Sequence, residues 1–344
     1  MAKPLLAFHE KGVANCKGCH VMHNSEDGQP IDPDNPPGNM RLLNDGTASD
    51  VCLSCHATQL GAVLGTDPLM PPPERGPGNF VFLLEENIND GPDGTAVPIP
   101  GHDAGHNLRA PAFGLDTDPR HTHAPGGSFP ASRMSCTSCH DAHGNDNYRM
   151  LRGAGIVPGS QGVSFMYDAP DAEGLPLEAG WESRGNHIAY RSGMSRWCQN
   201  CHMQIHQEGA MHSGVFEHPV DATLGSQIVT QYNQYNGTSD PTGGSASTAY
   251  LPEVPFEDGG NTVNRTIGPS TASRLSCMSC HRAHATSSPD AGRWDFKVNV
   301  LSEDGVKSGS YPIPSPFPEY NQEPLCQKCH GSGDVTVTPT TSFD

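Results

Sequence analysis

The cysteines of this chain all lie in one repeated motif, Cys-x-x-Cys-His. The chain has 344 residues and 12 cysteines, and six copies of the motif use every one of them. The cysteine pairs are Cys16 and Cys19, Cys52 and Cys55, Cys136 and Cys139, Cys198 and Cys201, Cys277 and Cys280, and Cys326 and Cys329. The histidines that complete the motifs are His20, His56, His140, His202, His281 and His330. This motif attaches c-type haem, because its thiolates bond the porphyrin and its histidine ligates the iron. The sequence therefore predicts haem c, six per chain.

Other uses of paired cysteines do not fit this pattern. A thioredoxin-like redox site has one Cys-x-x-Cys per domain and requires no following histidine. Structural zinc sites bring a second cysteine or histidine pair at short spacing, whereas the first cysteines of successive motifs here are 36 to 84 residues apart. A disulfide framework would not repeat the histidine six times. Haem attachment is the interpretation that explains all six copies.

The composition predicts a chain built around its cofactors. Hydrophobic residues make up only 34% of the chain, which also contains 39 glycines and 32 prolines. Six rigid, mostly apolar porphyrins would supply the missing core. We therefore expect a multihaem cytochrome c that is mostly irregular, with short α-helices at the motifs and few strands. Ser195 is a candidate N-cap for the helix that carries Cys198, and Pro324 and Gly331 are candidate boundaries of the last helix.

The charge and the hydropathy limit the partners and the location. The formal net charge is −18, which argues against nucleic acid or an anionic membrane as a partner. No apolar run is long enough for a transmembrane helix. Because bacteria attach haem c outside the cytoplasmic membrane, we expect export through the periplasm by a signal peptide absent from this numbering. An acidic turn at 90–94 could bind Ca²⁺, but a solvated turn is the simpler interpretation.

The six motifs fall into three pairs. The first motif of each pair is followed by a second histidine three residues on, and these histidines are His23, His143 and His284. We assign haem pair 1 to residues 1–100, pair 2 to 101–212 and pair 3 to 213–344, as parts of one continuous unit. Such doubled motifs resemble the paired modules of multihaem cytochromes.

The second axial ligand of each iron decides between electron transfer and substrate chemistry. The chain has 18 histidines, so 12 remain after the six proximal ones. His23, His143 and His284 cannot easily reach the far side of their own haems, and each is expected to ligate another haem. Upstream of each pair stands a further candidate, and these are His9, His106 and His218.

A complete assignment follows from counting sites. His9, His106 and His218 would serve the second haem of their pairs. His143 would serve the first haem of pair 1, and His284 the first haem of pair 2. This leaves His23 without a haem and the fifth haem without a ligand, so His23 would reach the fifth haem of a neighbouring molecule.

Some candidates remain open. His206 competes with the proposed distal ligands. We interpret five other histidines as surface residues or as neighbours of the ligands, and these are His102, His121, His123, His187 and His212. Methionines near the motifs are interpreted as haem packing, and these are Met22, Met134, Met194, Met203 and Met278.

Several segments outside the bare motif carry a family resemblance. They are FHEKGVANCKGCHVMHNS at 8–25, HAPGGSFPASRMSCTSCHDAHG at 123–144, GMSRWCQNCHMQIH at 193–206, PFEDG at 255–259, CMSCHRAHA at 277–285 and PLCQKCH at 324–330. The chain thereby resembles the OmcS-type outer-surface hexahaem cytochromes of metal-reducing bacteria, over about a third of its length. The resemblance implies bis-histidine iron throughout, a head-to-tail homopolymeric filament at the cell surface, and His23 crossing to the adjacent protomer.

Three functions follow from these observations. The first is long-range extracellular electron transfer along a conductive filament to acceptors such as metal oxides, with no enzymatic step. The second is a monomeric periplasmic electron shuttle with the same haems. The third is a multihaem reductase with one open haem, which all six histidine-terminated motifs argue against.

Overall fold

The computed structural model describes residues 16–33, 35–57, 63–68, 72, 75–85, 88–89, 98–99, 101–176, 179–206, 218–235, 243–294, 296 and 325–330. Several positions discussed above lie outside these residues. They are His9, His212, the acidic turn at 90–94, Pro324, Gly331 and the side chain of His206.

Helices in the described residues are short, and four of the five α-helices contain motif residues. The α-helices are α2 (Ala48–His56), α3 (Cys136–Cys139), α4 (Met194–Cys198), α5 (Ser226–Gln234) and α6 (Gln327–His330). The 3₁₀ turns are η1 (Cys16–Gly18), η2 (Met40–Leu42), η3 (Phe80–Leu84), η5 (Gly101–Asp103), η6 (Pro111–Phe113), η7 (Ala131–Arg133), η8 (Tyr148–Met150), η10 (Met203–His206), η11 (Ala246–Thr248), η12 (Cys277–Ser279) and η13 (Pro289–Ala291). In the part of the chain that the structure describes, no helix has the length and apolar character needed to cross a bilayer.

The strands that the structure describes form four separate antiparallel pairs. They pair β1 (Ser25–Glu26) with β2 (Gln29–Pro30), β3 (Ile88–Asn89) with β4 (Pro98–Ile99), β5 (Gly155–Ile156) with β6 (Ser164–Phe165), and β7 (Asp171–Glu173) with β8 (Ala189–Ser192). The last pair contains an irregularity between Asp171 and Ala172. The predicted fold class, short helices and few strands in a mostly irregular chain, is confirmed.

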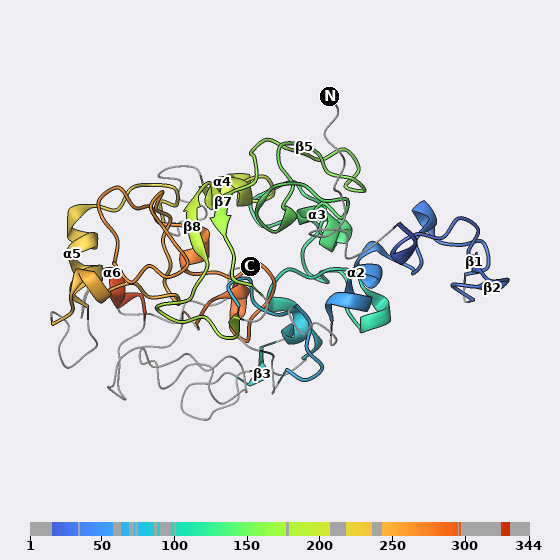
Figure 1. Cartoon of the computed structure of the whole chain (residues 1–344), viewed down its shortest axis with the longest axis horizontal. Coiled ribbons are helices and arrows are strands. Elements are labelled where there is room, and N and C mark those ends of the chain that lie inside the picture. Colours follow the sequence, from blue (N-terminus) through green and yellow to red (C-terminus); the bar gives the residue numbers. More distant parts are fainter. Residues whose placement is uncertain are drawn as a thin grey trace.

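The first hairpin and the last motif lie at opposite ends of the molecule. In Figure 1 the β1–β2 hairpin protrudes at one end, and α5 and α6 form the other. Helices α5 and α6 contact each other, as α2 contacts α3 and α4 contacts η12. The motifs are therefore distributed along the length of the chain's fold.

Apolar side chains of the described residues form four small clusters instead of one core. The first contains Phe80 and Phe82, the second Tyr250 and Trp294, the third Tyr190 and the fourth Phe129. Each cluster includes motif cysteines at its margin, and these are Cys136, Cys198, Cys201, Cys280, Cys326 and Cys329. The few apolar residues are thus grouped beside the haem-attachment sites.

Helix α4 does not begin as the sequence suggested. The N-cap is Gly193, with φ 83°, and Ser195 lies inside the first turn, so the prediction of a Ser195 cap is wrong. A buried carboxylate from a distant segment replaces it, because Glu257 Oε1 accepts the N–H groups of Met194 (3.1 Å) and Ser195 (3.2 Å). Free helix N–H groups need such acceptors, and a carboxylate suits the positive helix end.

The serine instead connects two motifs. Ser195 Oγ accepts the backbone N–H of Cys277 at 3.1 Å. In the same way, Ser49 Oγ in α2 accepts the N–H of Cys136 at 3.2 Å. In each case the serine stands three residues before the first cysteine of its own motif. The second motif of one pair is thereby joined to the first motif of the next.

Glycine at position 127 provides a test of the packing around the fourth motif. A Cβ at Gly127 would overlap the backbone carbonyl oxygen of Cys201. We expect Gly127→Ala to destabilise the haem-loaded protein by about 2 kcal/mol or more, because backbone atoms cannot move aside cheaply. The measurement is the denaturation midpoint. Gly185→Ala is the control, since nothing lies within 4 Å of its Cβ position; equal midpoints for both variants would contradict the packing described.

Candidate haem and iron-ligand sites

Each motif closes one turn of backbone around its two cysteines. The histidine N–H donates to the carbonyl of the first cysteine in motifs 1, 3, 4, 5 and 6, at distances of 2.9 to 3.1 Å. In motif 2 the whole sequence lies inside α2. Because residues four apart in such a turn share a face, the thiols and the imidazole are directed to the same side. This is the arrangement that covalent haem attachment requires.

The loop after the first motif of each pair is repeated three times. The Nδ1 atoms of His20, His140 and His281 each form a hydrogen bond with the backbone carbonyl oxygen of a residue nine or more positions later in the chain. The acceptors are Arg41 (3.1 Å), Arg149 (2.8 Å) and Asp290 (2.9 Å). All three acceptors, and the residue after each, have positive φ angles of 48–63°. Such conformations cost non-glycine residues about 1–2 kcal/mol each.

The strained loops fix the orientation of the imidazoles. An Nδ1–H held by a carbonyl leaves Nε2 as the free ligand atom. His202 is held in the same way by the carbonyl of Pro125 at 2.8 Å, and His106 by that of Ala283 at 2.8 Å. Burial also lowers the pKa values of His106, His140 and His218, and it lowers that of His284 to about 3. These imidazoles are therefore neutral near pH 7, which is the form that binds metal.

Four proximal histidines each face a second histidine from another segment. Ring centroids are 6.3 Å apart for His20 and His143, 6.5 Å for His140 and His284, 5.9 Å for His202 and His106, and 5.9 Å for His330 and His218. Two imidazoles on opposite sides of one metal ion have centroids roughly 6 Å apart, because each metal–nitrogen bond is about 2 Å. The residues present thus fit a haem iron between each pair. These are the four partners that the sequence assignment expected at these positions.

The other two proximal histidines differ. The expected partner of His56 is His9, which lies outside the described residues. His281 has no histidine ring against it within the described part of the chain, and its aromatic neighbour is Phe296, at 5.4 Å and 82°. His23 is exposed. The structure therefore does not bring His23 to any described proximal histidine of its own chain.

The cysteines connect the motifs in sequence order. Cys52 lies beside Cys136, Cys139 beside Cys201, and Cys198 beside Cys277.

The same closeness holds at the two ends of the series. Cys19 of motif 1 lies near Cys55 of motif 2, and Cys280 of motif 5 lies near Cys326 of motif 6. Each motif thus lies beside the next, from motif 1 to motif 6.

Histidines outside these pairs have other environments. His187 was expected near the surface or beside the ligands, but it is buried and stacks on Tyr250 at 3.8 Å. Its two nitrogens lie 3.0 Å from the carbonyl of Ile188 and 2.8 Å from that of Arg265. The surface interpretation is wrong for His187, because its ring, two residues before β8, packs against Tyr250 of the second apolar cluster. His121 and His123 are exposed, as expected.

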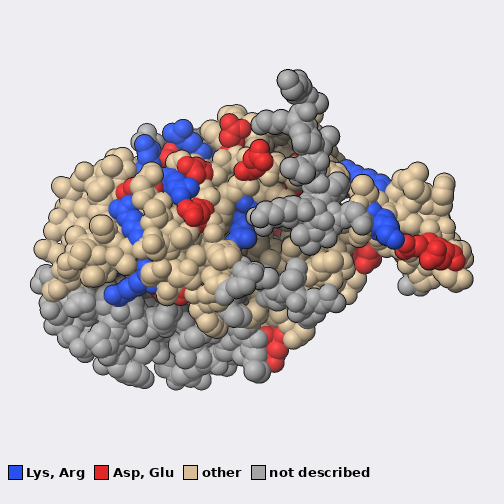
Figure 2. All heavy atoms as spheres, viewed as in Figure 1, with Lys and Arg blue, Asp and Glu red and all other residues tan. Residues whose placement is uncertain are grey.

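A protein-only metal centre has no support in the described residues. No group of three or more His, Cys, Asp or Glu side chains there could hold a metal ion. The surface offers no single-sign patch on the face shown in Figure 2, where Lys and Arg lie beside Asp and Glu. Arg191, for example, pairs with Asp171 at 3.4 Å, and Arg196 pairs with Asp221 at 2.6 Å.

Comparisons with known proteins agree with this geometry. The doubled CXXCH motif family matches residues 129–157. C-type cytochrome OmcS of Geobacter sulfurreducens is 31% identical over 357 residues, which cover 83% of this chain and 79% of that protein. This chain belongs to the OmcS family of c-type cytochromes. Haem c is accordingly its cofactor.

Two solved structures extend the agreement to the whole fold. The cryo-EM structure of OmcS nanowires from Geobacter sulfurreducens matches with a TM-score of 0.77 and 27% identity. The outer membrane cytochrome S filament from the same organism matches with a TM-score of 0.78 and 26% identity. Each match covers 94% of this chain and 100% of the other.

A buried charged cluster beside motif 5 was not predicted from the sequence. Arg293 donates to the carbonyls of Met278 (2.6 Å) and Pro252 (3.1 Å). Glu253 is buried nearby, and its Oε2 has no hydrogen-bond partner among the described residues. Burial raises the pKa of Glu253 from 4.5 to about 7. Only its place 12 residues after His281 could have singled out Arg293 from the sequence.

The pairing of imidazoles predicts the effect of removing one. We expect His218→Ala to convert one haem per chain from low-spin to high-spin, because His218 faces His330 and no other distal ligand is expected for that haem. Electron paramagnetic resonance of the oxidised protein measures this change. His121→Ala is the matched control and should leave the spin states unaltered. A His218→Ala spectrum identical to that of the parent would contradict the pairing.

The raised pKa of Glu253 predicts a pH-dependent stability. The carboxyl of Glu253 has a pKa near 4.5 in the unfolded chain and about 7 in the folded protein, so it keeps its proton to a higher pH when the protein is folded. Its contribution is therefore full below pH 4.5 and is lost as the pH rises through about 7. We expect Glu253→Gln to flatten this part of the curve of denaturation midpoint against pH. Parallel curves for the two proteins would exclude Glu253 as the cause.

Proposed function

We propose that this protein carries electrons over long range outside the cell, through six bis-histidine c-type haems per chain in a homopolymeric filament. Each chain would join the next head to tail, with His23 ligating the fifth haem of the adjacent protomer. The electrons would pass to extracellular acceptors such as metal oxides. No residue is assigned a catalytic role.

The opposed imidazoles carry this proposal. An iron with an imidazole on both faces has no open site for a substrate, so it can only accept and donate electrons. Four such pairs are formed by described residues. The spacing argues against a reductase with one open haem at these four positions.

The order of the motifs supports a continuous path. Each motif contacts the next through its cysteines, and distal histidines come from neighbouring modules: His143 faces His20, and His284 faces His140. A ligand donated from one module to the next haem holds the two haems close together. Close, fixed haems are what electron transfer along a chain of sites requires.

The positions of His23 and His281 support polymerisation. His23 is exposed two residues before β1, which belongs to the protruding hairpin in Figure 1, and His281 has no histidine opposite it among the described residues. A donor on one surface and an acceptor on another make a heterologous contact, which yields a filament when its rotation does not close. The matching solved structures are filaments of OmcS.

Removing the donor tests the proposal. We expect His23→Ala to abolish filaments while the chain still folds and binds its haems, because His23 faces no described histidine of its own chain. Negative-stain electron microscopy and light scattering of the secreted protein measure assembly. His123→Ala, another exposed histidine, is the control and should polymerise like the parent.

Two outcomes would contradict the proposal in different ways. Filaments of normal length from His23→Ala would exclude ligand sharing through His23. Monodisperse single chains of the parent protein would exclude the filament and favour the soluble periplasmic shuttle.

A further inference from the structure

The residue after His23 is held far more firmly than His23 itself. Asn24 is buried, with 8% of its surface exposed, and has φ 49°. His23 is exposed and makes no hydrogen bond to any residue that the structure describes. Asparagine is one of the few residues that tolerate this left-handed conformation. The conformation of Asn24 therefore sets the direction in which His23 leaves the chain.

The side-chain amide of Asn24 is fully used within one loop. Its Nδ2 donates to the carbonyls of Asp32 (3.0 Å) and Asn35 (2.9 Å), and its Oδ1 accepts the N–H of Asp32 (2.9 Å). Its own carbonyl accepts the N–H of Ile31 at 3.0 Å. Both donors and the amide oxygen of one side chain thus connect the start of the loop to its middle.

A second layer of polar contacts holds the rest of the loop. The carboxylate of Asp32 accepts the N–H of Asn35 (3.1 Å) and Nδ2 of Asn39 (2.9 Å). Asn35 Nδ2 donates to Asn39 Oδ1 at 2.8 Å and to the carbonyl of Gly38 at 3.1 Å. Gly38, with φ 82°, lies against Asn24, and a Cβ there would lie 3.2 Å from Asn24 Cβ. The loop 24–39 is closed around this asparagine.

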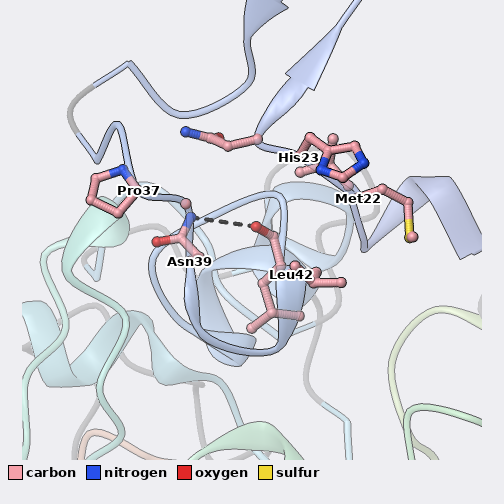
Figure 3. A pocket seen from close by; sticks show the side chains of 9 residues that line it. Met22, His23, Pro37, Asn39 and Leu42 are labelled. Atoms are coloured by element: carbon pink, nitrogen blue, oxygen red, sulfur yellow. Dashed lines mark hydrogen bonds between the residues drawn. The ribbon is translucent and has the colours of Figure 1, made fainter.

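The two equivalent histidines need no such loop. His284 donates its N–H to Pro77 and accepts the N–H of His106 through its carbonyl, so distant segments of the same chain hold it. His143 faces His20 within the chain. His23 lies on the rim of a pocket of about 240 Å³, beside Met22 and across from Pro37 (Figure 3). Among the described residues, the hydrogen bonds of Asn24, the next residue in the chain, all come from loop 24–39.

We propose that Asn24 is a positioning residue that holds His23 ready to ligate the haem of a second copy of this chain. This inference rests on the proposed function. Assembly costs conformational entropy when a ligand must be ordered at the moment of binding, and a preformed ligand avoids that cost. The clamp of loop 24–39 around Asn24 supplies the order in advance.

Two substitutions separate the clamp from the backbone conformation. Asn24→Asp keeps the size of the side chain, its tolerance of positive φ and the oxygen that accepts the N–H of Asp32. It replaces the Nδ2 amide group, which donates two hydrogen bonds, by an oxygen that would face the carbonyls of Asp32 and Asn35. Asn24→Gly keeps the backbone freely able to adopt φ 49° and removes all three side-chain bonds. Asn264→Asp, at an exposed asparagine, is the control for the added charge.

We expect both Asn24 variants to raise the protein concentration needed for filament assembly by about tenfold or more. Below that concentration one haem per chain should be high-spin, and free imidazole should restore its low-spin spectrum without restoring filaments. The other haems, including that of His20 and His143, should stay low-spin. Asn264→Asp should assemble like the parent.

The outcomes distinguish this inference from the proposed function. If the parent assembles and His23→Ala does not, while both Asn24 variants assemble at the parent's concentration, the positioning role is refuted and the filament stands. If His23→Ala also assembles normally, ligand sharing through His23 fails, and with it the part of the proposed function on which this inference rests. High-spin signals from more than one haem in both Asn24 variants would show general damage to the fold and would also refute the specific role.

Discussion

The contact on which the structure depends is the pair of imidazoles from two distant segments, facing each other across the space for one iron. His143 reaches His20 and His284 reaches His140, each from the module that follows. The apolar clusters of the described residues are small, so they cannot by themselves hold a chain so rich in glycine and proline. A covalent haem held between two facing imidazoles would act as a cross-link between loops.

The imidazoles need support of their own because the loops around them are irregular. Backbone carbonyls of Arg41, Arg149 and Asp290 hold the proximal rings, at the cost of left-handed backbone at each. Strain of this kind persists only where surrounding contacts enforce it. The bridges from His20 to Leu43, His140 to Leu151 and His281 to Gly292 supply those contacts in each repeat.

The sequence predicted the haem attachment and the imidazole pairs better than it predicted the local backbone structure. Six motifs and a count of histidines were enough to expect four imidazole pairs, because ligand supply is a property of residue type and order. The start of α4 was missed because the carboxylate that accepts its first N–H groups, that of Glu257, comes from a segment 62 residues or more away. The burial of His187 and Glu253 was missed for the same reason, since both depend on tertiary packing that no local pattern encodes. The clamp around Asn24 was visible only once loop 24–39 was closed.

The most direct test of ligand sharing between copies is to compare the iron spin states of the wild-type protein in the filament and in the dissociated chain. If the second ligand of the fifth haem comes from the next copy, every iron is low-spin in the filament, and dissociation exposes one high-spin iron per chain. An identical count in both states, or a high-spin iron that persists in intact filaments, would contradict the account.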